Sequence, residues 1–203
     1  GRTWMTIIAA VFFYYCGKQL EKISLLCGHD KETARYSKII FLFSPLIIYC
    51  TIAGGQIDII YILMVLLALP FYYKGKIRTF SVIMSFAIAF KLLPLLIFIP
   101  LLLLVEKRIK EIMINGGIAL SVTAVTKVLF ERGYGSSAVS DIMYLRHSFM
   151  DLILYSNIGN TINLFLLIYV AVVLWAYRKK IDADDRKNLL TTSMKMIFII
   201  YIA

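Results

Sequence analysis

The sequence has little charge and few of the residues that build the sites of soluble enzymes. Only 17% of its 203 residues are charged, and it contains two His and three Cys. No Cys pair has the CxxC spacing, and no P-loop, GxSxG or HExxH motif occurs. These absences argue against a disulfide framework, a structural metal site, a P-loop nucleotide site and a serine hydrolase.

Apolar residues are abundant instead. They make up 61% of the chain, and its mean hydropathy is +0.82. The charged residues gather in clusters, and many of the apolar runs between them approach the roughly 20 residues with which a helix crosses a membrane. The apolar segments are approximately 3–16, 39–54, 57–73, 79–105, 112–130, 161–177 and 194–203. We therefore predict an all-α fold, a polytopic transmembrane helical bundle in which residues 1–203 form part of a single domain.

The basic residues indicate how such a bundle would be oriented. Most of the 22 Lys and Arg residues lie between apolar segments, and loops rich in Lys and Arg face the cytoplasm in membrane proteins. We expect the cytoplasmic loops at about 17–38, 74–78, 106–110 and 178–193. The outer loops are then expected at about 54–57 and 131–160. The net charge of +10 follows from this arrangement, and since no basic stripe with interleaved aromatic residues is present, we expect no nucleic-acid partner.

The segment 79–105 conflicts with this topology unless it turns back. A single crossing would place the basic loops 74–78 and 106–110 on opposite sides of the membrane. The segment is interrupted by Lys91 and then Pro94, and the residue before a proline disfavours helical geometry. We therefore predict a hairpin of two short helices whose tip lies near Lys91.

Five polar residues on the outer half are candidates for ligand binding: Gln56, Asp58, Lys91, Arg146 and His147. Asp58 follows a double glycine and either caps the helix that begins there or, with Gln56, faces a ligand. Lys91 either extends its side chain to the membrane interface or is a buried cation that binds an anion. The second alternative follows because ionisable residues in membrane segments are commonly functional. Arg146 and His147 either form a solvated face or contact a phosphate.

Two stretches resemble a known family. SPLIIYCTIAGGQIDIIYILMVLLALPFYYKGK, from Ser44 to Lys76, is similar to a segment of membrane glycosyltransferases of the GT-C superfamily. FSVIMSFAIAFKLLPLLIFIPLLLL, from Phe80 to Leu104, resembles the segment that follows it, with Lys91 and Pro94 in an a-x-K-x-x-P pattern. The nearest branch is the α-mannosyltransferase-like enzymes that use polyprenyl-phosphate sugars.

The resemblance implies a multi-pass enzyme with its active site on the outer face of a bacterial plasma membrane. It would move a sugar, with mannose as our choice, from a polyprenyl-phosphate carrier to a lipid-linked or envelope acceptor, among membrane lipids. Lys91, with Arg146 or His147, is expected at the carrier phosphate, and Gln56 and Asp58 at hydroxyl groups. We expect no metal and no other cofactor. The catalytic base is not identified, since the family's carboxylate belongs to an outer loop that we expect to precede residue 1.

Two other functions fit parts of the sequence. A secondary transporter or lipid flippase also contains broken helices and polar residues at membrane depth. A non-catalytic subunit of an envelope-assembly complex would need none of the five candidate residues.

Overall fold

The computed structural model is built almost wholly from helices, and it describes residues 2–49, 51, 58–130, 153–155, 161–179, 181 and 185–202. The helices are α1 (Arg2–Leu26), α2 (Lys31–Leu42), α3 (Pro45–Ile48), α4 (Ile59–Tyr73), α5 (Ile77–Phe90), α6 (Leu93–Val105), α7 (Ile109–Phe130), α9 (Leu164–Arg178) and α10 (Arg186–Ile202). Two short antiparallel strands, β1 (Ile153–Tyr155) and β2 (Thr161–Asn163), precede α9. This confirms a helical fold. Among the described residues, only Ile109–Leu129 is both long and apolar enough to cross a membrane, and the other apolar helices are shorter.

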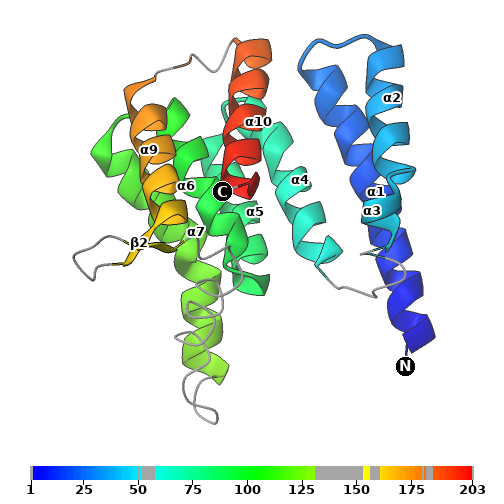
Figure 1. Cartoon of the computed structure of the whole chain (residues 1–203), viewed down its shortest axis with the longest axis horizontal. Coiled ribbons are helices and arrows are strands. Elements are labelled where there is room, and N and C mark those ends of the chain that lie inside the picture. The colour runs from blue at the N-terminus through cyan, green and yellow to red at the C-terminus, as the bar shows by residue number, and fades with distance from the viewer. Residues whose placement is uncertain are drawn as a thin grey trace.

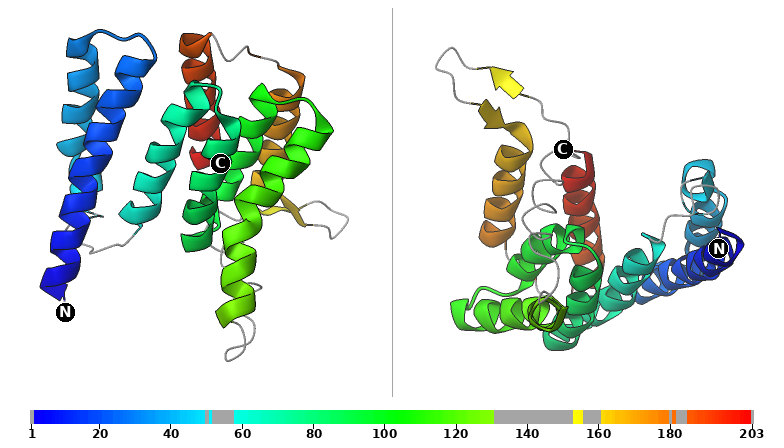
Figure 2. Two further views of the ribbon diagram at one scale, coloured as in Figure 1. Left: turned by 180° about the vertical axis from the view of Figure 1, so that it is seen from behind. Right: turned by 90° about the horizontal axis from the view of Figure 1, so that it is seen from below.

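The helices run up and down, so their connections gather at two ends of the molecule. Figures 1 and 2 place the α1–α2, α4–α5 and α6–α7 connections, the end of α9 and the beginning of α10 at one end of the molecule. We call it the basic end, because Lys74, Lys76, Lys107, Arg108, Arg178 and Lys179 lie there. The N-terminus, α3, the beginning of α4 and the break between α5 and α6 lie at the opposite end (Figure 1). Which side of a membrane each end faces stays a prediction.

The connection between α4 and α5, at the basic end, is a tight turn. Gly75 has a φ of 72°, a left-handed conformation that glycine adopts without steric cost. The Lys76 N–H donates to the Phe71 carbonyl at 2.9 Å and the Gly75 N–H to the Tyr72 carbonyl at 3.0 Å. This is the Schellman pattern, which satisfies carbonyls that the end of a helix would otherwise leave unpaired.

An aromatic cluster joins α4, α5 and α6. The rings of Tyr72 and Phe80 are 5.1 Å apart, and those of Phe80 and Phe98 are 5.5 Å apart. The Tyr72 hydroxyl donates to the Leu101 carbonyl at 2.9 Å, which satisfies the one polar atom of this buried side chain. The cluster fixes α5 and α6 beside α4, and it thereby positions the break between them.

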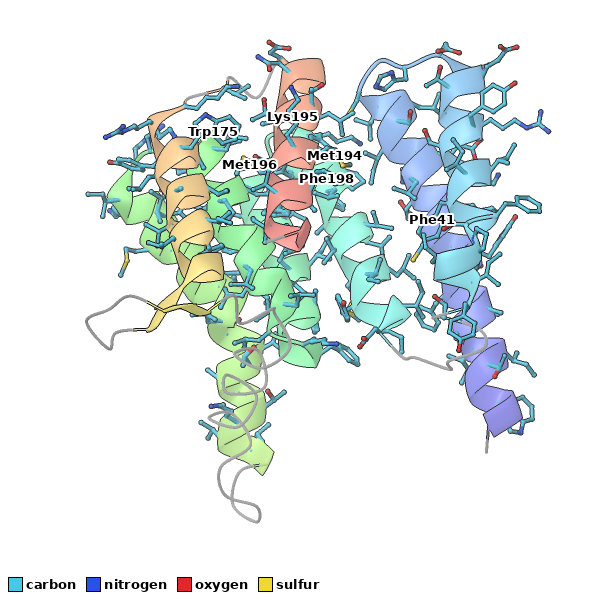
Figure 3. The ribbon with its side chains drawn as sticks, in the orientation of Figure 1. Phe41, Trp175, Met194, Lys195, Met196 and Phe198 are labelled. Atoms are coloured by element: carbon cyan, nitrogen blue, oxygen red, sulfur yellow. The ribbon has the colours of Figure 1, made fainter. Side chains whose placement is uncertain are left out.

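Many large apolar side chains remain on the surface of the helices. On α10, Met196 is fully buried on the side of α9, whereas Phe198, on the side of α4, is 66% exposed (Figure 3). Val128 on α7 and Trp4 on α1 are exposed to a similar degree. Exposed apolar surface on helices is compatible with contact with lipid or with another protein.

Several segment boundaries differ from those expected. The predicted loop 178–193 is helical from Arg186, where α10 begins. The predicted loop 17–38 is mostly helical, because α1 continues to Leu26 and α2 begins at Lys31. The predicted apolar segment 39–54 is divided after α2 by Pro45, where α3 begins. Proline disfavours helical geometry in the residue before it, which accounts for the interruption.

Candidate active site

The helical hairpin between residues 77 and 105 breaks at Lys91, as the sequence predicts. Lys91 is extended, with φ −155° and ψ 141°, and its N–H donates to the Ala87 carbonyl at 3.2 Å to close α5. Pro94 lies in the first turn of α6, where a helix can accommodate a proline because the N–H groups there have no partner within the helix. The break therefore projects the Lys91 side chain from an irregular backbone.

Asp58 lies at the N-terminus of α4, in the capping position. Its carbonyl accepts a hydrogen bond from the Ile62 N–H at 3.3 Å. Its backbone, however, is already helical and its side chain makes no capping hydrogen bond. The interpretation of Asp58 as a side-chain cap is therefore wrong, although the position is right.

The Asp58 carboxylate pairs with Lys91 instead. Asp58 Oδ2 lies 2.8 Å from Lys91 Nζ, a charge-assisted hydrogen bond between residues 33 positions apart in the chain. The two side chains are 42% and 47% exposed, so the pair is open to solvent. The structure thus brings together two of the five candidate residues that the sequence identifies.

Tyr61 completes this cluster, and the sequence analysis missed it. The Lys91 ammonium lies 5.5 Å from the centre of the Tyr61 ring, within the range of a cation–π contact. Tyr61 follows Asp58 by three residues, so both lie on the same face of the first turn of α4. That spacing was the available signal, but it has a meaning only once Lys91 is known to face this turn.

The other three candidate residues, Gln56, Arg146 and His147, lie outside the described residues. What the structure shows is therefore a cation, a carboxylate and an aromatic ring at the end opposite the basic end. An ammonium with an exposed carboxylate beside it can bind an anionic group and a hydroxyl group at once, since one donates and the other accepts hydrogen bonds.

The comparisons give the class of protein to which this arrangement belongs. Residues 2–202 match the family model of Glycosyltransferase family 87, almost the whole chain. None of the curated proteins and none of the solved structures is significantly similar to it. The chain belongs to Glycosyltransferase family 87, and it is a glycosyltransferase.

Proposed function

We propose that this glycosyltransferase is an integral-membrane enzyme that uses a polyprenyl-phosphate sugar. It transfers the sugar, mannose in this proposal, to a lipid-linked or envelope acceptor at the outer face of a bacterial plasma membrane. The observation that carries the proposal is the Asp58–Lys91 pair at the helix break, 2.8 Å between oxygen and nitrogen. A cation held beside a carboxylate meets the needs of a reaction in which a phosphate departs and a hydroxyl attacks.

The membrane assignment is supported by the distribution of apolar and basic residues. Large apolar side chains such as Phe198 and Val128 are exposed on the helix surfaces, as expected for contact with lipid. The basic end lies opposite the break between α5 and α6 (Figure 1), and Lys91 is the residue at that break. If Lys- and Arg-rich loops face the cytoplasm, Lys91 lies on the outer half.

The proposed reaction is a direct displacement at the anomeric carbon. The acceptor hydroxyl oxygen forms a bond to that carbon, and the bond from the carbon to the carrier phosphate oxygen breaks, so the configuration inverts. A carboxylate takes the hydroxyl proton, and the bonding electrons leave with the phosphate. Lys91 stabilises the charge that develops on the departing phosphate.

The remaining candidates have supporting roles in this proposal. Arg146 or His147 adds a second cation at the phosphate, and Gln56 and Asp58 hydrogen-bond to sugar or acceptor hydroxyls. Apolar helix surfaces accommodate the lipid tail of the carrier.

A transfer assay tests the proposal. Membranes containing the full-length enzyme receive radiolabelled polyprenyl-phosphate mannose, and label is followed into lipid. Lys91→Ala should lower kcat/KM by about 10- to 150-fold, the equivalent of one hydrogen bond to a charged group, about 1.5–3 kcal/mol. Lys127→Ala, which removes an exposed Lys from the last turn of α7, is the matched control and should remain within about twofold of wild type.

Two results would contradict the proposal. Full activity of Lys91→Ala would show that Lys91 does not contact the donor phosphate. Failure of mannose, glucose and arabinose donors alike, together with transport of a lipid or solute by the same membranes, would favour a transporter or flippase.

A further inference from the structure

Lys91 is contacted by two residues from the beginning of one neighbouring helix. Asp58 Oδ2 forms its 2.8 Å ion pair, and the ring of Tyr61 lies 5.5 Å from its ammonium. Both contacts come from the beginning of α4, whereas Lys91 belongs to the break after α5. The ammonium is therefore held by a neighbouring helix and not by its own.

The two contacts differ in whether they compete with a phosphate for the Lys91 ammonium. The Asp58 carboxylate takes an N–H group of Lys91 and neutralises its charge, so it competes with a phosphate oxygen for the ammonium. An aromatic ring attracts a cation through its quadrupole and takes no formal hydrogen bond from the ammonium. A phosphate can therefore replace Asp58 on Lys91 while the contact with Tyr61 persists.

The exposure of the pair allows such an exchange. With 47% of the Lys91 side chain and 42% of the Asp58 side chain exposed, neither group must leave a packed core to change partners. An ion pair with this exposure stabilises its geometry by only about 0.2–1 kcal/mol, which corresponds to a factor of about 1.5 to 5 in an equilibrium constant. The resident carboxylate is a weak competitor.

We propose that the Asp58 carboxylate is paired with the Lys91 ammonium in the empty enzyme and that the phosphate of the carrier displaces this carboxylate. The Tyr61 ring keeps its contact with the ammonium while the two anions exchange. This inference rests on the proposed function, because it assumes that Lys91 binds the phosphate. Displacement frees the Asp58 carboxylate only when a donor is bound, so hydroxyl recognition follows donor binding. Tyr61 is a positioning residue, since it acts through Lys91.

Binding of the sugar-free carrier tests the exchange. Polyprenyl phosphate is titrated into the detergent-solubilised full-length enzyme, and its Kd is measured. Asp58→Asn, which removes the competing charge, should lower Kd by about 1.5- to 5-fold. Asp58→Glu, which retains a carboxylate, should bind as wild type does. Glu32→Gln in the first turn of α2 is the control for loss of an exposed carboxylate elsewhere.

Tyr61 is tested by comparing two variants. Tyr61→Leu should raise Kd and the donor KM by about two- to fivefold while kcat stays unchanged. Tyr61→Phe retains the ring and should restore the wild-type values. Tyr36→Leu, at an exposed position on α2, is the control and should change neither constant.

The results separate this inference from the function on which it rests. If Lys91→Gln binds the carrier as wild type does, the phosphate assignment fails and the exchange with it. If Lys91→Gln weakens binding but Asp58→Asn binds no tighter than wild type, the exchange is wrong and the proposed function stands. Equal binding by Tyr61→Leu and wild type would remove Tyr61 from the mechanism.

Discussion

Lys107 joins two helices at the basic end, and replacing it should destabilise the whole bundle. Its ammonium lies 2.7 Å from the carbonyl oxygens of Ala176 and Tyr177 and 3.0 Å from that of Lys179, and it also contacts the carbonyl of Leu103, so four acceptors share its three N–H groups. Ala176 and Tyr177 belong to the last turn of α9 and Lys179 follows its last residue, so these carbonyls lie where backbone acceptors have no partner within the helix. One side chain from the connection after α6 thus closes α9.

The expected cost follows from these contacts. A hydrogen bond to a charged group contributes about 1.5–3 kcal/mol, and a cation at a helix C-terminus adds about 0.3–1 kcal/mol. Because the contacts share one ammonium, their contributions do not add fully, and Lys107→Met should cost about 2–4 kcal/mol. For a chain of 150–250 residues this lowers the Tm by about 4–16 °C.

The assay is thermal unfolding of the full-length protein in detergent. Methionine preserves most of the length of the lysine side chain, so Lys107→Met removes the ammonium with little loss of packing. The matched control is Arg108→Gln. The Arg108 side chain is 83% exposed, and its Nε lies 3.9 Å from Glu106 Oε1 in a weak surface ion pair. A Tm of Lys107→Met equal to that of Arg108→Gln would refute the reasoning.

Three further predictions concern the helix ends and the core. The carboxylate of Asp30 accepts hydrogen bonds from the Thr33 hydroxyl at 2.6 Å and N–H at 3.0 Å, which lowers the pKa of Asp30 below its usual 3.8. The stabilisation by these hydrogen bonds is present above pH 3.8 and is lost as the pH falls through the lowered pKa of Asp30. Asp30→Ala should therefore lower the Tm at pH 7, and the difference in Tm between wild type and the variant should narrow in acid. The hydroxyls of Tyr73 and Ser193 lie 2.8 Å apart and link α4 to α10, so a double-mutant cycle with Phe and Ala should give a coupling of about 0.5–1.5 kcal/mol, and a value near zero would contradict the bond. Gly75→Ala should destabilise the α4–α5 turn by about 1 kcal/mol, because Gly75 has positive φ, whereas Gly75→Asn should cost less in the same unfolding assay.

The sequence predicted the parts of the fold that local chemistry determines. The break follows from Pro94, which has no N–H for the Phe90 carbonyl and whose ring would clash with it, so α5 cannot continue through this proline. The predicted loop 74–78 contains Gly75, which adopts the left-handed conformation that glycine favours. The sequence analysis did not predict that α1 extends to Leu26. The last turns of α1 contain several charged residues, and these residues were interpreted as part of a loop. They are helical because Ile23 and Cys27 are buried and because Glu21 pairs with Lys38 of α2 at 2.9 Å, contacts that only the fold supplies.

The candidate site, like the fold, could be predicted only in part from the sequence. Asp58 and Lys91 could each be selected alone, since each is a charge beside a long apolar segment. Their pairing could not be predicted, because it depends on how α4 and α5 pack across 33 residues of sequence. Tyr61 could be distinguished from the other aromatic residues only by its spacing of three residues from Asp58, which has no meaning until Lys91 is known to face this turn.

Stability alone does not explain the position of the Asp58 carboxylate. As a side-chain cap it would stabilise α4 by about 0.5–2 kcal/mol, yet it makes no capping hydrogen bond. As the partner of a Lys91 side chain that is 47% exposed, it contributes no more than about 1 kcal/mol. The buried aromatic contacts of Tyr72, Phe80 and Phe98 already hold α4, α5 and α6 together. Neither charge is therefore needed to hold these helices together, which agrees with the ligand-binding role that we propose for the pair.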